Sequence, residues 1–206
     1  MNHFRAPALF LFAFLPLTGA IAEQWRATEE EMRLLPPYCV AKIGADRDNV
    51  AAQQHWSGVF GAENWLHLHH YCDGLNFLNR SFKRGGDKTA SDFDLRRAIN
   101  NFDYVLDRAS SDFVLLPEIM AQKARALRML GQKAEAASLY ARVISMRADY
   151  IPAYIALGDF YKESGDAKKA RETYEAGLKQ HPGHRSLVRR LNRLKRDEAR
   201  RTTPSH

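Results

Sequence analysis

Ile151–His184 reads IPAYIALGDFYKESGDAKKARETYEAGLKQHPGH, and a weaker copy of the same pattern begins 34 residues earlier, at Pro117. The small residue Gly158 in the first stretch corresponds to Ala124 in the copy. The other matched pairs are Ala170 with Ala136, Tyr161 with Leu127, Gly165 with Gly131, Tyr174 with Tyr140 and Leu178 with Ile144. A fixed period of 34 residues with small residues at fixed positions is typical of stacked helix–turn–helix units. The sequence therefore predicts an all-α fold, a short α-solenoid of antiparallel helix pairs, with regular repeats at 117–150 and 151–184.

A third, irregular hairpin is predicted at residues 62–112. Ala98, Phe102 and Leu106 repeat the positions of Ala136, Tyr140 and Ile144. Before them, apolar residues recur at three- and four-residue spacing, the pattern of a packed helix. The glycine-containing, polar stretch around 81–91 predicts a long loop between the two helices, with Ser91 as the N-cap of the second helix.

The ends of the array are predicted to differ from its repeats. A capping helix is predicted at residues 185–201. Such a helix would have one apolar face and one face rich in arginine, as the exposed end of an array requires. Residues 202–206 are expected to be a disordered tail. Residues 23–61 predict an N-terminal helical segment, and the capping box Thr28–Glu31 starts its first helix.

The first 22 residues resemble a secretory signal peptide. Arg5 supplies a positive charge, residues 8–17 (ALFLFAFLPL) are apolar, and Ala20-Ile21-Ala22 fits a cleavage site. The apolar run is shorter than the roughly 20 residues that span a bilayer, so an uncleaved anchor is the less favoured alternative. We expect cleavage after Ala22 and export to the periplasm, with the extracellular space as the alternative.

Export bears on the two cysteines of the chain, Cys39 and Cys72. In an oxidising compartment two cysteines are more often paired than free. We therefore expect a disulfide between them that ties the N-terminal segment to the first hairpin. The alternative is a pair of buried thiols.

The last repeat resembles the tetratricopeptide repeat, known as TPR. The residues that carry the resemblance are Tyr154, Leu157, Gly158, Tyr161, Ala170, Tyr174 and Pro182. The resemblance covers 117–184 well and 62–112 loosely. The exported leader, the segments 35–39 and 70–75 and the C-terminal repeats together resemble small exported TPR proteins of Gram-negative bacteria.

This resemblance implies a protein-interaction or scaffolding module that binds a peptide or protein partner in a groove, without catalysis. The groove is lined by the first helix of each repeat. By repeat position it presents Ala121, Arg125, Arg128, Ile155, Asp159 and Lys162. Arg125 and Asp159 stand where the carboxylate-binding version of the family has asparagine, so capture of a C-terminal carboxylate is not expected.

The stretch Trp65–Cys72, WLHLHHYC, is the one candidate for chemistry. His67, His69, His70 and Cys72 fall within two helical turns and could ligate a metal. No nearby carboxylate or second cysteine pair completes a site of familiar spacing, and a disulfide would remove Cys72 as a ligand. We therefore expect no metal or other cofactor, and keep an envelope metal-binding or accessory protein as the alternative function.

Other functions are weakly supported by the sequence. A nucleophile motif such as G-x-S-x-G, a phosphate-binding glycine loop and a C-x-x-C-H haem site are all missing from it. The formal net charge is +7, and much of it lies in the last helix. Aromatic residues do not alternate with these arginines and export disfavours a nucleic-acid partner. The basic face is either a solvated surface or a contact for an acidic protein or an anionic membrane.

Overall fold

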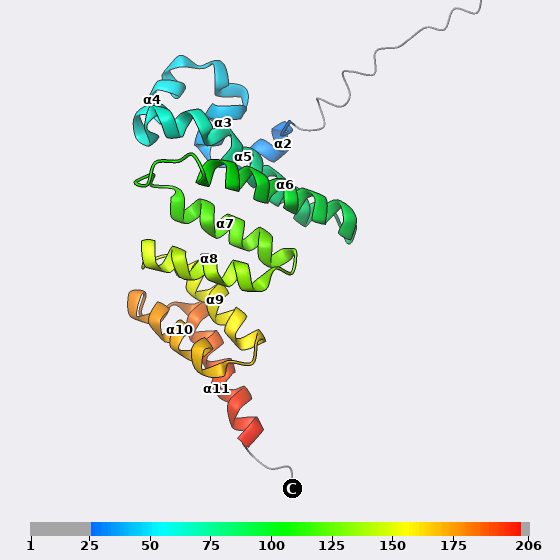
Figure 1. Cartoon of the computed structure of the whole chain (residues 1–206), viewed down its shortest axis with the longest axis vertical. Helices are drawn as coiled ribbons and strands as arrows, with labels where there is room; N and C mark the ends of the chain where they lie inside the picture. Colours follow the sequence, from blue (N-terminus) through cyan, green and yellow to red (C-terminus); the bar gives the residue numbers. More distant parts are fainter. Residues whose placement is uncertain (1–25, 203–206) are drawn as a thin grey trace, which may run out of the picture.

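The protein folds into α-helices and one short 3-10 helix within residues 26–202, the part of the chain that the computed structural model describes, with side chains described through residue 200 (Figure 1). The predicted all-α fold is confirmed. In chain order the elements are α2 (Glu29–Met32), α3 (Pro37–Ile43), the 3-10 helix η1 (Ala45–Asp48), α4 (Val50–Phe60), α5 (Ala62–Lys83), α6 (Lys88–Leu106), α7 (Leu116–Met129), α8 (Lys133–Met146), α9 (Ile151–Glu163), α10 (Ala167–Gln180) and α11 (Arg185–Thr202). The signal peptide expected at 1–22 and residues 203–206 of the expected tail lie outside the described residues. Within the described range no helix is long and apolar enough to cross a membrane.

The helices stack as an α-solenoid of antiparallel pairs along the long axis of the molecule (Figure 1). The pairs are α5 with α6, α7 with α8 and α9 with α10, and each pair packs against the next. Apolar side chains fill the spaces within and between the pairs in three successive clusters. The predicted capping helix is α11, which packs on α10 and α9 and extends through Thr202, one residue into the predicted tail.

The two regular repeats turn in the same way. Gly131 and Gly165 follow the first helix of each pair with positive φ angles of 85° and 82°, which a residue without a Cβ adopts at little cost. The N–H of the next residue, Gln132 or Asp166, then donates to a carbonyl of the preceding helix, at 2.9 Å in both cases. These bonds close the ends of α7 and α9 and return the chain antiparallel.

The first hairpin is irregular because its two helices are longer than those of the other pairs. The prediction of a long loop around 81–91 was wrong. α5 has 22 residues and α6 has 19, and only residues 84–87 connect them. Asp87 caps α6 by accepting from the N–H of Ala90 at 3.0 Å, so the predicted cap Ser91 lies inside the helix. Arg84 donates to the buried carboxylate of Asp94 at 2.6 Å, and this ion pair holds the two helix ends together.

Residues 28–43, which we call the N-terminal strap, pack across α5. The capping box predicted at Thr28–Glu31 is present and starts α2. Glu31 accepts from Arg80 of α5, with an Nε–Oε1 distance of 2.7 Å. Cys39 of α3 is joined to Cys72 of α5 by a disulfide, as predicted, and both residues are fully buried. The strap is therefore held on the first repeat by the disulfide, by the Glu31–Arg80 pair and by a longer Glu30–Lys83 ion pair at 3.5 Å.

The Glu31–Arg80 pair should make stability depend on acidity. The hydrogen bond from Arg80 lowers the pKa of Glu31 from 4.5 to about 2. Because the ionised form is favoured in the folded protein, its contribution is present above the ordinary pKa and is lost as pH falls toward 2. We expect Glu31→Gln to reduce the free energy of unfolding at pH 7, and expect the difference from wild type to shrink between about pH 5 and pH 3.

Urea unfolding at pH 7, 5 and 3 measures this difference. Glu175→Gln, at an exposed position of α10, is the matched control and should track the wild type at all three values. A Glu31→Gln deficit that stays constant with pH would show that the pair contributes by packing and not by charge.

Candidate functional site

The first helices of the repeats share one face of the solenoid. Counting in steps of 34 from α7 relates Arg125 to Asp159 in α9 and to Arg193 in α11. The corresponding residue of α5 follows from packing: a Cβ on Gly74 would lie 2.5 Å from the ring of Phe102, just as one on Gly158 would lie 2.3 Å from Tyr174. We define the concave face as three rows of equivalent residues from α5, α7, α9 and α11. The rows are Tyr71, Ala121, Ile155 and Arg189; Leu75, Arg125, Asp159 and Arg193; and Leu78, Arg128, Lys162 and Arg196.

Gly74 was not identified as a repeat position from the sequence. Its distance to Phe102 is 28 residues, against 16 between Gly158 and Tyr174, so the constant period is interrupted. The extra residues form additional turns of α5 and α6. A glycine inside an apolar helical stripe was the available indication, because it often marks the close approach of another element.

The six residues predicted to line the groove fall by repeat register in these rows, and they differ in accessibility. Arg125 and Arg128 are exposed and Ile155 is half-buried. Ala121 is buried against the next helix pair and presents almost no surface. The accessible part of α7 on this face is therefore mainly its two arginines.

Asp159 and Lys162, two of the predicted groove residues, are paired with residues of the capping helix. The Asp159 carboxylate accepts from Arg190 Nε at 2.8 Å and from the Tyr174 hydroxyl at 2.8 Å. Lys162 Nζ lies 2.9 Å from an Asp197 carboxylate oxygen. Both pairs join α9 to α11, so these two side chains hold the cap in place.

At the first repeat the concave face is covered by the N-terminal strap. Tyr38 of the strap stacks on Tyr71 with ring centroids 6.5 Å apart, and burial raises the pKa of Tyr38 to about 12. Between the strap, α5 and α7 a cavity of about 240 Å³ remains, which we call the strap pocket. Its walls include Leu34, Tyr38, Leu75, Gln122 and Arg125. The strap therefore replaces the open groove of the first repeat by a pocket that is bounded on one side by α7.

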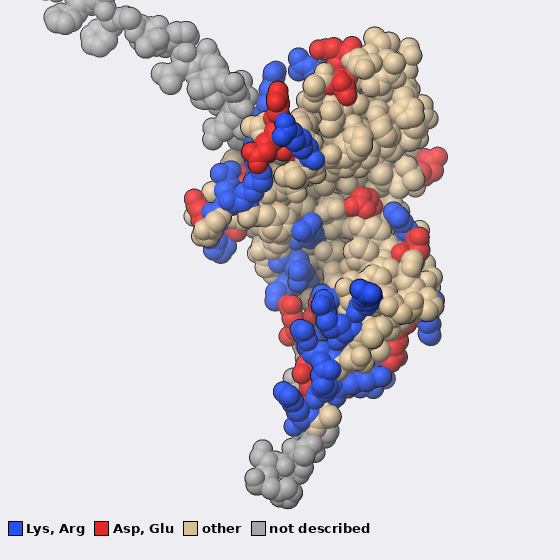
Figure 2. Space-filling view, turned by 180° about the vertical axis from the view of Figure 1, so that it is seen from behind, with Lys and Arg blue, Asp and Glu red and all other residues tan. Residues whose placement is uncertain are grey.

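The exposed charge of the concave face is basic toward the C-terminus. Figure 2 views the molecule from the side opposite to Figure 1 and shows Lys and Arg side chains gathered over its C-terminal half. Arg189, Arg193 and Arg196 of α11 are all exposed. Within the described part of the chain, no carboxylate lies within 4.0 Å of these three guanidinium groups.

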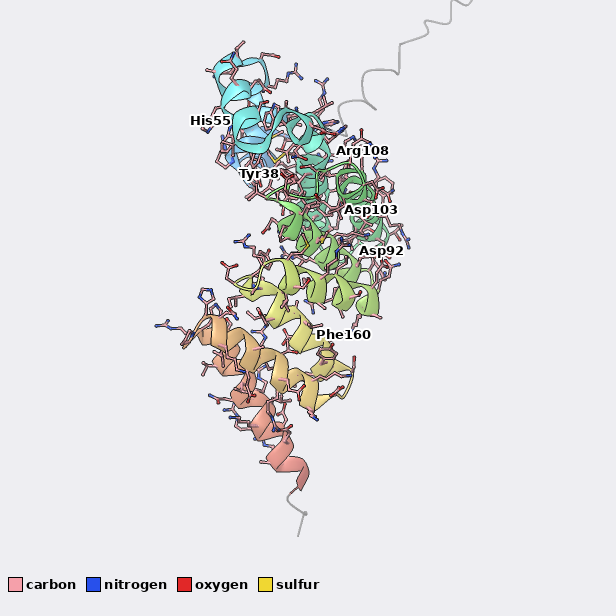
Figure 3. The ribbon with its side chains drawn as sticks, turned by 60° about the vertical axis from the view of Figure 1, so that its left-hand side comes forward. Tyr38, His55, Asp92, Asp103, Arg108 and Phe160 are labelled. Atoms are coloured by element: carbon pink, nitrogen blue, oxygen red, sulfur yellow. A yellow bond between two sulfur atoms is a disulfide. The ribbon has the colours of Figure 1, made fainter. Side chains whose placement is uncertain are left out.

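The histidines of α5 serve the packing of the first hairpin. His70 Nδ1 lies 2.8 Å from Asn101 Oδ1, and its ring packs on Tyr104 with centroids 3.6 Å apart. His67 contacts the Tyr104 hydroxyl at 3.5 Å, whereas His69 Nδ1 lies 3.0 Å from a backbone carbonyl of its own helix. Figure 3 shows the side chains of this region as sticks, with Asp103 and Arg108 of the same stretch of chain labelled.

The alternative metal site at His67, His69 and His70 is not assembled. Cys72 is in the disulfide and cannot ligate. Among residues 26–200, no three histidine, cysteine, aspartate or glutamate side chains are grouped so as to hold a metal. His67 and His70 instead contact Tyr104 of α6, and His69 bonds to the backbone of its own helix.

Comparison with known proteins identifies the repeats. Residues 127–193 match the family model for the tetratricopeptide repeat. Solved structures with a similar fold include the Sgt2 TPR domain from Aspergillus fumigatus, at 22% identity and a TM-score of 0.48, over 65% of this chain and 87% of that one. They also include the second TPR domain of human RPAP3 in complex with an HSP70 peptide, at 19% identity and a TM-score of 0.44, over 59% of this chain and 98% of that one. The structure of MamA matches at 17% identity and a TM-score of 0.48, over 81% of this chain and 97% of that one.

The comparison with curated proteins found no match. The matched range 127–193 begins near the end of α7 and includes α8, α9, α10 and the first half of α11. Residues 127–193 of this chain are tetratricopeptide repeats.

Proposed function

We propose that this protein is an exported scaffolding module that binds a protein or peptide partner on its concave face, without turnover. The observation that carries the proposal is that the first helices of TPR units present exposed arginines beside an open pocket on one face. A concave surface lined by side chains from successive helices suits an extended or helical partner. One neighbour of similar fold, the first TPR of RPAP3, was solved with a peptide of HSP90.

The proposal includes export to the periplasm of a Gram-negative bacterium. The leader pattern at 1–22 supports it, and so does the disulfide, because disulfides persist in oxidising compartments. It also includes contact of the basic face of α11 with an acidic protein or an anionic membrane surface.

Site-specific photo-crosslinking in cells tests which face binds. The photoreactive residue p-benzoylphenylalanine replaces Arg193 on the concave face or Arg142 on the outer helix α8, both exposed positions. We expect discrete adducts from position 193 and none from position 142. Equal adducts from both positions, or none from either, would contradict binding on the concave face. Fractionation of the same cells tests the location, because an exported chain appears in the periplasmic fraction without residues 1–22.

A further inference from the structure

The charges of the concave face are unbalanced because its carboxylates already have partners. Asp159 is bound by Arg190, and Asp197 is bound by Lys162. Glu163 lies 2.7 Å from Lys133 and 3.9 Å from Arg128. Arg189, Arg193 and Arg196 are left exposed on the same face. The surface open to a partner over α11 is therefore strongly positive.

The strap pocket supplies a different kind of surface two helix pairs away. Leu34 of the strap is 55% exposed beside this cavity, and Tyr38 and Leu75 add apolar wall. Arg125 stands at the same pocket, with its guanidinium 4.5 Å from the centroid of the Phe82 ring. Glu118 also lines this pocket, and its carboxylate accepts from Gln122 Nε2 at 2.8 Å. An apolar side chain followed by a carboxylate would match this arrangement.

From these two features we propose that the concave face binds an acidic protein segment, which places one apolar side chain in the strap pocket and its carboxylates against Arg125 and the arginines of α11. This inference rests on the proposed function and names the chemistry of its partner. Successive packed helices lie about 8–10 Å apart, so the path from α7 to α11 is roughly 20 Å, or about six or seven extended residues. The pocket wall contributed by residues 34–38 lies outside the TPR units, so the strap takes part in selecting the partner.

A protein segment fits this surface better than a membrane does. The strap pocket is recessed between α5, α7 and the strap, and a flat bilayer surface does not enter such a recess. The arginines of α11 also lie on the same face as the pocket, so one flexible chain can reach both. An anionic membrane would contact the exposed arginines alone.

Selection from a phage-displayed library of random dodecapeptides, using the oxidised full-length chain, tests the partner chemistry. We expect selected peptides to be enriched in aspartate and glutamate next to a leucine, methionine or phenylalanine. Fluorescence anisotropy of one selected peptide then measures affinity. We expect the affinity to fall as salt is raised, because exposed ion pairs are screened.

Three variants locate the bound peptide. Arg189→Glu combined with Arg193→Glu should weaken binding about tenfold, because the change removes two exposed ion pairs with the peptide. Leu34→Glu should weaken it by a similar factor by placing a charge at the strap pocket. Arg142→Glu, an equal charge change on the outer helix α8, should leave affinity unchanged. All four positions are exposed, and thermal melting confirms that each variant folds.

The outcomes separate this inference from the proposed function. Selected peptides that lack acidic residues, or whose binding ignores the arginine and Leu34 changes, would overturn the inference while leaving a peptide-binding module. Failure to select any peptide would also overturn it, and failure of crosslinking at Arg193 would then overturn the proposed function as well. Sedimentation with vesicles of phosphatidylglycerol and phosphatidylcholine, abolished by Arg189→Glu with Arg193→Glu, would assign the arginines to a membrane and overturn the inference.

Discussion

Replacing Cys39 and Cys72 together by alanine is expected to lower the free energy of unfolding by about 3–4 kcal/mol. The disulfide closes a loop of 33 residues, and in the chain-entropy model this restricts the unfolded chain by about that amount. Both residues are fully buried, so removal of the sulfur atoms also leaves less well filled space between α3 and α5. Urea unfolding of the oxidised wild type and the double variant measures the loss.

Reduction provides the control for this prediction. Dithiothreitol should shift the unfolding of the wild type toward that of the double variant and should leave the double variant unchanged. Limited proteolysis should then cut first within residues 26–60, because packing and the ion pairs Glu31–Arg80 and Glu30–Lys83 then hold the strap on α5 without a covalent link. Equal unfolding midpoints for the oxidised wild type and the double variant would show that packing holds the strap without the disulfide.

The disulfide also connects stability with the proposed site. Cys39 lies one residue after Tyr38, and Tyr38 forms a wall of the strap pocket. A strap that detaches on reduction would expose Tyr71, Leu75 and Leu78 of α5 and would abolish the pocket. The reduced wild type should therefore bind the peptide as weakly as the oxidised Leu34→Glu variant does.

The regular half of the fold was predictable because the same residue pattern occurs in two copies, 117–150 and 151–184, at a fixed spacing. The 34-residue period, the turn glycines and the small residues at Ala136 and Ala170 all indicate the same helix pairs, and α7 to α10 lie where they were expected. The first hairpin offers no second copy at the same spacing. Its polar connection looked like a loop, whereas the ion pair between Arg84 and Asp94 supports helix close to both ends of the turn.

The site was only half predictable, for a physical reason. Repeat register assigns a residue to a face of the solenoid, but it does not say whether another element already binds that residue. Asp159 meets Arg190 and Lys162 meets Asp197 across α9 and α11, at sequence separations that the repeat does not encode. The strap pocket was missed for the same reason, because residues 34–38 reach it only through the fold.

Gly158→Ala is expected to lower the free energy of unfolding by about 2–3 kcal/mol, although alanine is ordinarily the better helix former. The new Cβ would lie 2.3 Å from Cε1 and 2.6 Å from Cδ1 of Tyr174, so the ring or a helix must move. The ring is fully buried, and its hydroxyl donates to the Asp159 carboxylate, which also holds Arg190. Moving the ring therefore strains the attachment of α11 as well.

The same substitution at Gly58 is the matched control. Gly58 lies in α4 with no atom within 4 Å of an added Cβ, so alanine there should stabilise the protein by about 0.5–1 kcal/mol. Thermal and urea unfolding of the two variants should therefore move in opposite directions. The equivalent position of the preceding repeat holds Ala124, buried in the same cluster as Tyr140, so a helix pair can be spaced to accept a methyl group. If α9 and α10 can adopt that spacing without cost, Gly158→Ala will have the same unfolding midpoint as the wild type. That result would show that the close approach at Gly158 is not required for stability.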